Sequence, residues 1–206
     1  MPLETSRRMA IVDVAWVIGV SLAYVALETA HVPKRWSYLA VAVLLAAFGV
    51  YIARRGADSW RDLGFRYDNL RAGIGPASIF TLIAGCSVIA WAAAHGQAVW
   101  SPQVAVLLAL YPAWALVQQL AFQGVLHRKL MVIVPSRTLQ VLIPACAFAA
   151  VHVGNTALVA LTFVAGVSWS MLYRRYPNLW LLGASHTVLA ALAYPLVLGD
   201  APLSRL

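Results

Sequence analysis

Seven apolar segments separated by short polar connections account for most of the chain. A helix needs about 20 apolar residues to cross the hydrocarbon core of a bilayer, and most of the segments approach that length. We predict spans at Met9–Leu27, Trp36–Ile52, Ala72–Ala94, Val104–Leu126, Leu139–Val153, Thr156–Tyr173 and Leu179–Leu198. The fifth segment is short, so we expect it to be tilted or broken near Gly154–Asn155. Because backbone groups in lipid must pair within their own segment, the pattern predicts an all-α integral membrane bundle of about seven transmembrane helices.

The basic residues gather in alternate connections. With the N-terminus placed in the cytoplasm, twelve of the fifteen Lys and Arg residues fall on the inner side, and Lys34, Arg35 and Arg205 fall on the outer side. Cytoplasmic loops carry an excess of Lys and Arg, so we expect a cytoplasmic N-terminus. The first apolar run contains Asp13 and is longer than the core of a signal peptide, so we expect it to be a retained helix.

Composition supports this reading: 62% of the residues are hydrophobic and 11% are charged. Soluble domains carry roughly 25% charged residues, so the chain is neither disordered nor a typical soluble globule. The basic residues that give the chain its net charge of +8 lie between the apolar runs. We therefore expect contact with lipid headgroups and no nucleic-acid partner. Ala53–Arg71 is the one long polar connection, so we expect residues 1–206 to form a single domain. The short outer loops favour a bacterial inner membrane.

Polar side chains within the spans are the candidates for function, because they are costly in a bilayer. Gln118, Gln119 and Gln123 share one face of the fourth predicted helix, and spans five and seven contribute His152 and His186. The amides could serve only to hold packed helices together. The alternative is a polar site where three helices converge. We expect that site beneath the cytosolic leaflet, because Gln118 and His186 lie about 10–12 Å from the inner ends of their spans.

These residues resemble the CAAX-protease and bacteriocin-processing family of intramembrane proteases, also called Abi or type II CAAX prenyl endopeptidases. That family carries Glu-Glu-x-x-x-Arg, Phe-x-x-x-His and His-x-x-x-Asn on separate helices. The corresponding positions here are Gln118-Gln119-x-x-x-Gln123, Phe148-x-x-x-His152 and His186-x-x-x-Ala190. Upstream, Leu63–Arg66 is similar to an element that often precedes the family core. The similarity covers residues 60–195 and follows two N-terminal spans in residues 1–52.

The resemblance implies an endopeptidase that acts on membrane-anchored or lipidated, CAAX-like C-terminal peptides. In the family, the first glutamate and the first histidine activate water, and the arginine supports the glutamate pair. By position, Gln118 stands at the water-activating acid, Gln119 stands beside it and Gln123 replaces the arginine.

The remaining positions carry over in the same way. The resemblance implies that His152 acts with the activating acid and that His186 stabilises the oxyanion. Ala190 stands where an oxyanion-stabilising asparagine is common, and Phe122 and Phe148 would support the substrate pocket.

Glutamine keeps the shape of glutamate but cannot take a proton from water at ordinary pH. General acid–base catalysis contributes about 10²–10⁴ in rate, so its loss should weaken hydrolysis strongly. Neutral glutamines occupy the positions of both acids and of their basic partner, so no buried arginine is left without a counter-charge. The coordinated replacement fits a site that is neutral in the natural protein, and it equally fits deliberate inactivation of a cloned protein.

No Asp or Glu lies between Asn69 and Gly199, so an acid for catalysis would have to come from the first span. Asp13, embedded near the inner end, could act as a base or as a histidine partner, whereas we expect Glu28 to be exposed near the outer end. A zinc site is poorly supported, because two histidines fall short of the usual three protein ligands. We therefore expect no cofactor.

Three readings follow. The first is an endopeptidase of the family, and the second is a pseudoprotease that binds a peptide or lipid chain without cutting it. The third is an unrelated seven-helix transporter or scaffold. The residue chemistry favours weak or absent hydrolysis.

Overall fold

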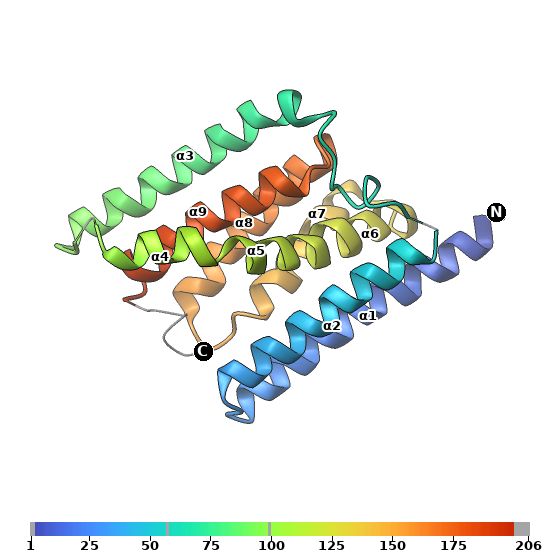
Figure 1. Ribbon diagram of the computed structural model, residues 1–206, viewed down its shortest axis with the longest axis horizontal. Helices are drawn as coiled ribbons and strands as arrows, with labels where there is room; N and C mark the ends of the chain where they lie inside the picture. The colour runs from blue at the N-terminus through green and yellow to red at the C-terminus, as the bar shows by residue number, and fades with distance from the viewer. Residues whose placement is uncertain (1–2, 57, 99, 200–206) are drawn as a thin grey trace.

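The computed structural model describes residues 3–56, 58–98 and 100–199, which are almost entirely helical (Figure 1). The helices are α1 (Leu3–Thr29), α2 (Lys34–Arg54), α3 (Leu70–Ala94), α4 (Pro102–Leu110), α5 (Pro112–Gln119), the π-helix η1 (Leu120–His127), α6 (Arg128–Ile133), α7 (Arg137–Ala150), α8 (Thr156–Arg175) and α9 (Leu179–Leu196). The described ranges contain no strand. The prediction of an all-α integral membrane bundle is confirmed.

Five helices in these ranges, namely α1, α2, α3, α8 and α9, are long and apolar enough to cross a membrane. The bent helix pair from Pro102 to Ile133 makes a sixth if it is counted as one span. The predicted fifth span corresponds to α7, whose 14 residues extend only about 21 Å. Its length falls short of the roughly 30 Å hydrocarbon core, so length and composition of the described helices support five spans, or six with the bent pair, rather than seven.

The fourth predicted span is wrong in shape and in extent. It bends by 54° between α4 and α5, where Pro112 follows Tyr111. Proline has no N–H to continue the helical hydrogen bonds and clashes with the preceding turn, which accounts for the break. Beyond the bend the helix continues to Ile133, seven residues past the predicted end at Leu126.

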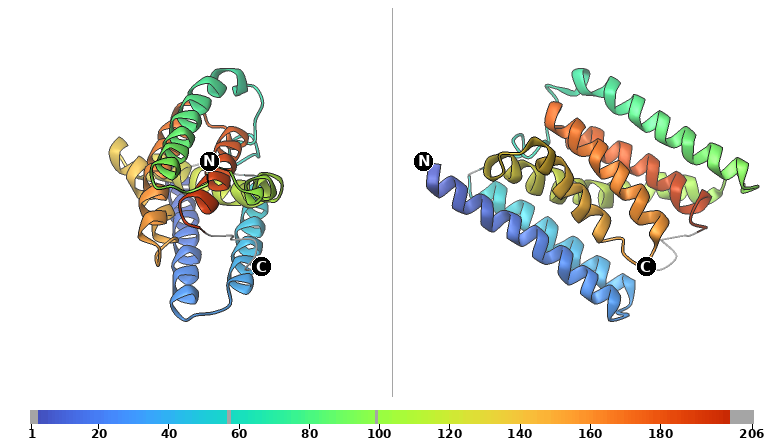
Figure 2. Two further views of the ribbon diagram at one scale, coloured as in Figure 1. Left: turned by 90° about the vertical axis from the view of Figure 1, so that its left-hand side faces the viewer. Right: turned by 180° about the vertical axis from the view of Figure 1, so that it is seen from behind.

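The bundle has two flanks (Figures 1 and 2). The α1–α2 hairpin forms one flank, α3 forms the other, and the broken helix runs between them with α7, α8 and α9. The hairpin contacts the remaining helices mainly through α1 against η1 and α6, whereas α3 packs on α9 and α7 packs on α8. The largest buried cluster lies where the hairpin meets η1, and it includes Val17, Ile52 and Leu126.

We call one end of the bundle the basic end: it holds the loop Arg55–Asn69, the C-termini of α2, α6 and α8, and the N-termini of α3, α7 and α9. Arg174 and Arg175 lie there in the last turn of α8. The other end, with the α1–α2 and α7–α8 turns, is the far end. Of the residues predicted for the outer side, Arg205 and the side chain of Lys34 lie outside the described part of the chain.

The loop between α2 and α3 is packed onto the basic end through its own backbone. The Leu63 carbonyl accepts a hydrogen bond from the Tyr173 hydroxyl at 3.0 Å, and the Gly64 carbonyl accepts one from the Leu179 N–H at 2.8 Å. A Cβ at Gly124 would lie 2.8 Å from the Leu63 carbonyl oxygen. Glycine on η1 therefore allows the loop to approach the helix that carries the candidate amides.

Candidate functional site

The three candidate glutamines lie where the broken helix changes from α to π geometry. Gln118 and Gln119 end α5, and Gln123 lies within η1. In a π-helix each N–H bonds to the carbonyl five residues back, which widens the turn and changes which side chains share a face. All three glutamines are buried, with at most 6% of each residue exposed.

Gln119 faces α9. Its amide nitrogen lies 3.4 Å from Nδ1 of His186, which is also buried. The His186 ring packs against the rings of Trp169 and Tyr111, with centroids 4.7 and 5.6 Å away. Gln119 and His186, predicted from separate spans, therefore meet.

Gln123 faces α8 and lies closer to the basic end than Gln119. Its amide nitrogen donates to the Ser170 hydroxyl at 3.0 Å, and its carbonyl oxygen lies 2.9 Å from Nδ1 of His127. His127 is fully buried beside Tyr173, with ring centroids 5.7 Å apart. Gln123 is therefore held by neutral groups of its own helix and of α8.

His152 does not lie within a helix as predicted. It follows the end of α7 at Ala150, and its Nδ1 lies 2.7 Å from the Phe148 carbonyl, one of the oxygens left open at a helix C-terminus. The Phe148 ring packs against both candidate histidines, at 5.0 Å from His152 and 5.5 Å from His186. Phe148 thus lies between the two imidazoles, and Phe122 packs on it at 5.2 Å.

A cavity of about 570 Å³ separates the α1–α2 hairpin from the rest of the bundle toward the far end. Gln118, Phe122 and His152 line it. We expected the site near the basic end, but Gln118 lies about 20 Å from that end because its helix continues to Ile133. Thr29 and Asn155, both exposed, also line the cavity and mark its opening at the far end.

Gln119 and Gln123 point away from this cavity, toward α9 and α8. Ala190 is buried in a separate apolar cluster with Tyr111 and Ala115. The predicted residues therefore form a cavity-facing group, with Gln118 and His152, and a buried hydrogen-bonded group, with Gln119, Gln123 and His186. Phe148 connects the two groups.

Asp13 and Glu28 of α1 lie differently from our expectation. Asp13 is fully buried, and both carboxylate oxygens accept hydrogen bonds from the Arg55 guanidinium, at 3.1 and 2.8 Å. Lys129 lies 3.4 Å from the same carboxylate. Glu28 is half-buried and lines the cavity, so its expected exposure is wrong. The reason is that α1 extends to Thr29, which places Glu28 on its final turn beside the cavity.

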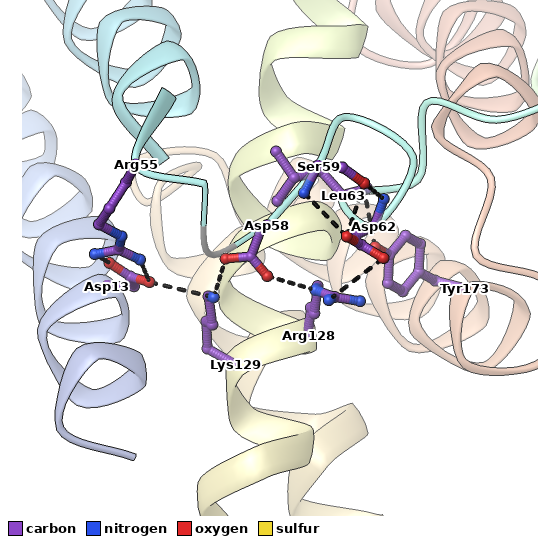
Figure 3. A network of polar contacts seen from close by, with 9 residues as sticks. All are labelled: Asp13, Arg55, Asp58, Ser59, Asp62, Leu63, Arg128, Lys129 and Tyr173. Atoms are coloured by element: carbon purple, nitrogen blue, oxygen red, sulfur yellow. Dashed lines mark hydrogen bonds and ion pairs between the residues drawn. The ribbon is translucent and has the colours of Figure 1, made fainter. Parts of the chain in front are cut away.

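Figure 3 shows the ion-pair network at the basic end. Asp58 pairs with Lys129 and with Arg128, the latter at 3.1 Å, and Lys129 also reaches Asp13. The network therefore links the hairpin, the loop and α6, in agreement with the basic residues predicted for one face of the membrane.

Two exposed carboxylates of the same loop have perturbed pKa values. The Ser59 N–H and hydroxyl both donate to Asp62 and lower the pKa of that carboxyl. Hydrogen bonds from Arg66 and Arg61 hold the pKa of the Asp68 carboxyl well below its usual range. Both loop acids are therefore ionised at neutral pH.

Within the described ranges, no three His, Cys, Asp or Glu side chains lie close enough together to hold a metal ion. Cys86 and Cys146 are both exposed on the surface of the bundle.

A family model described as "Type II CAAX prenyl endopeptidase Rce1-like" matches residues 100–192. Over this segment the chain is similar to Rce1-like proteins. The match spans just under half of the 206 residues and contains all three motif regions, from Gln118 to Ala190. It confirms the resemblance found in the sequence. No curated protein and no solved structure matches the chain.

Several residues of the candidate site were missed by sequence reasoning. His127 and Ser170 hold Gln123, and Ser185 accepts hydrogen bonds from Trp169 at 3.0 Å and from Thr81 at 2.7 Å. The regular spacing of Gln119, Gln123 and His127, four residues apart, was a signal for a polar helix face. Nothing local pointed to the serines, because their partners lie on other helices.

Proposed function

We propose that this Rce1-like membrane protein binds a membrane-embedded peptide segment in the cavity lined by Gln118 and His152, and does not hydrolyse it. The observation that carries the proposal is the chemistry of the acid positions. Gln118 and Gln119 occupy them, and a carboxamide cannot act as a general base at ordinary pH. The loss of acid–base catalysis alone lowers a rate by about 10²–10⁴.

The buried hydrogen-bonded group supports this proposal. Gln119 is engaged with His186, and Gln123 with Ser170 and His127, all through neutral groups. A glutamate and an arginine inserted here would have to replace bonds that the amides already make. The arrangement is that of an uncharged interior that holds the helices beside the cavity, as buried polar groups do when they are paired.

A second candidate function is peptide hydrolysis, which one observation favours. Glu28 and His152 line the same cavity. The chain therefore has a carboxylate in the cavity, even though amides stand at the positions of the two glutamates of the family motif. Asp13, the other acid considered for this role, is held by Arg55 and Lys129 at the basic end.

A cleavage assay separates the two functions. The full chain, in lipid nanodiscs, is given a quenched-fluorescent farnesylated CAAX-type peptide, and both binding and cleavage are followed. We expect binding without cleavage in the natural sequence. Gln118→Glu/Gln119→Glu/Gln123→Arg with Ala190→Asn should introduce cleavage, and adding His152→Ala should abolish it.

The outcomes are distinct. Cleavage by the natural sequence that is lost in both His152→Ala and Glu28→Gln would replace the binding proposal with the second function. Failure of the peptide to bind would reject both functions. The proposed cellular location, a bacterial inner membrane, rests on the short outer loops and is tested by membrane fractionation.

A further inference from the structure

The opening of the cavity lies about one membrane thickness from the basic end. Thr29, His31 and Asn155 line the cavity and are exposed, so they mark its opening near the α1–α2 and α7–α8 turns. Asn155 directly precedes α8, whose 20 residues run to Arg175 at the basic end. Twenty residues of α-helix extend about 30 Å, the thickness of the hydrocarbon core. The opening therefore lies at the membrane face opposite the basic end.

Toward the basic end the cavity is closed. Val17 and Leu126 are fully buried where the hairpin packs against η1. Beyond this apolar layer, Asp13 pairs with Arg55 at 2.8 Å and with Lys129 at 3.4 Å (Figure 3). A ligand coming from this end would have to part the hairpin from η1 and α6 and break these ion pairs. The structure therefore gives the ligand a path at the far end and blocks one at the basic end.

The basic residues indicate which end faces the cytoplasm. Twelve of the fifteen Lys and Arg residues lie in the loop and at the helix ends of the basic end, from Arg7 near the start of α1 to Arg175 at the end of α8. Arg35, in the first turn of α2, lies at the far end. Cytoplasmic segments are enriched in Lys and Arg, and this rule counts basic residues rather than net charge, so the acids of the loop do not weaken it. The rule places the basic end in the cytoplasm and the opening of the cavity on the other side.

The lining of the cavity suits an apolar peptide. Tyr24, Tyr38 and Trp114 line it, and the ring centroid of Tyr38 lies 5.9 Å from that of Tyr24 and 5.7 Å from that of Trp114. Gln118 lies deeper, and its carbonyl oxygen is buried without a hydrogen-bond donor in the described part of the chain. A buried acceptor without a partner is costly. A peptide backbone carries N–H donors at regular spacing, whereas a hydrocarbon chain carries none.

We infer that the cavity takes its peptide from the non-cytoplasmic side of the membrane. The ligand is an apolar polypeptide segment exposed at that face, at the end of an exported or membrane-anchored chain. A lipidated peptide on the cytoplasmic face would meet the closed basic end instead. This inference rests on the proposed peptide-binding function, and it adds the side from which the ligand enters and the class of polypeptide that can reach the cavity.

The first experiment determines which face the opening occupies. Cys86→Ala/Cys146→Ala removes the two exposed native thiols. In this background Thr29→Cys places one thiol at the opening, and Tyr67→Cys, at a position 71% exposed in the loop of the basic end, is the matched control. Spheroplasts of an expressing bacterium are treated with a membrane-impermeant maleimide. We expect Thr29→Cys to be labelled in intact spheroplasts and Tyr67→Cys only after lysis. Any other pattern overturns the inference.

The second experiment measures the side from which the unaltered protein binds its ligand. The farnesylated peptide of the cleavage assay is joined to a polyethylene glycol chain that stops it from crossing the bilayer. Right-side-out and inside-out vesicles are prepared from the same cells, and vesicles without the protein correct for partitioning. We expect binding to right-side-out vesicles to be at least about tenfold tighter than binding to inside-out vesicles.

The failure of this inference is distinct from failure of the proposed function. Equal binding to the two kinds of vesicle, tighter binding to inside-out vesicles, or binding in nanodiscs alone would overturn entry from the non-cytoplasmic side and leave peptide binding intact. Absence of binding in nanodiscs as well would overturn the proposed function itself.

Blocking the opening provides a third measurement, in nanodiscs, where both faces are accessible. A bulky maleimide–polyethylene glycol group on Thr29→Cys should weaken peptide binding by about tenfold or more, because it obstructs the opening. The same group on Tyr67→Cys should leave binding unchanged. Equal effects at the two positions would contradict entry at the far end.

Discussion

Replacing Asp13 with Asn tests how strongly the ion-pair network holds the α1–α2 hairpin to the bundle. Asp13 is fully buried, and its carboxylate faces the Arg55 guanidinium and the Lys129 ammonium group. Asparagine keeps the shape but turns an N–H₂ group toward one of these cations. Two positive charges are then left at the basic end with less compensation.

The expected loss follows from the burial of the partners. Breaking a buried ion pair by removing one member costs about 3–5 kcal/mol. The side chains of Arg55 and Lys129 are 18% and 10% exposed, and Lys129 keeps Asp58, so we expect the lower end, about 3 kcal/mol. For a chain of this size that corresponds to a fall of about 6–12 °C in the unfolding temperature.

The assay is thermal unfolding of the full chain in one detergent, followed by tryptophan fluorescence. A thiol-reactive dye is unsuitable, because Cys86 and Cys146 are exposed in the folded protein. Asp68→Asn is the control: Asp68 lies in an exposed loop and pairs with Arg66, so its loss should change the unfolding temperature little.

A double variant adds a second check. Asp13→Leu/Arg55→Met removes the pair as a unit and should recover part of the stability that Asp13→Asn loses, since apolar replacement of a whole buried pair is often neutral. If Asp13→Asn unfolds at the same temperature as the unaltered protein, the network does not hold the hairpin and the reasoning is refuted.

Two other predictions concern the loop at the basic end. Gly124→Ala places a Cβ 2.8 Å from the Leu63 carbonyl oxygen and should cost about 1–3 kcal/mol in thermal unfolding, whereas Gly75→Ala, with open space around it, should cost nothing; equal effects would contradict the close approach. The lowered pKa of Asp62 means that its bonds to Ser59 stabilise the fold above its ordinary pKa of 3.8 and are lost as pH falls through the lower, folded value. The unfolding temperature should therefore fall between pH 5 and pH 3, less steeply in Asp62→Asn; identical pH profiles for the two proteins would count against the bond.

The sequence was sufficient for most of the helices because length and hydropathy determine whether a segment can cross a bilayer. The starts of α8 and α9 are also local, since Asn155 and Asn178 accept hydrogen bonds from Leu158 and Leu181 at the first turn. The bend at Pro112 could have been read from the proline inside the fourth predicted span.

The polar contacts depended on long-range packing that no local pattern contains. Asp13 and Arg55 are 42 residues apart, and Gln119 and His186 are 67 apart. Sequence reasoning found that the amides and imidazoles belong together, but it placed Glu28 in solvent and put all three amides in one pocket. The second error arose because adjacent residues of a helix point about 100° apart, so Gln118 faces the cavity while Gln119 faces α9.

The wide turn of η1 also sets the rotational phase between the two ends of its helix. A π-helix has more residues per turn than an α-helix, so each residue turns the chain by less than about 100°. If this segment tightened to ordinary α geometry while Gln118 kept facing the cavity, Lys129 would turn away from Asp13 and Asp58. The eight residues of η1 therefore couple the two positions: the cavity-facing amide and the ammonium group that holds the hairpin are both in place only while the helix stays wide.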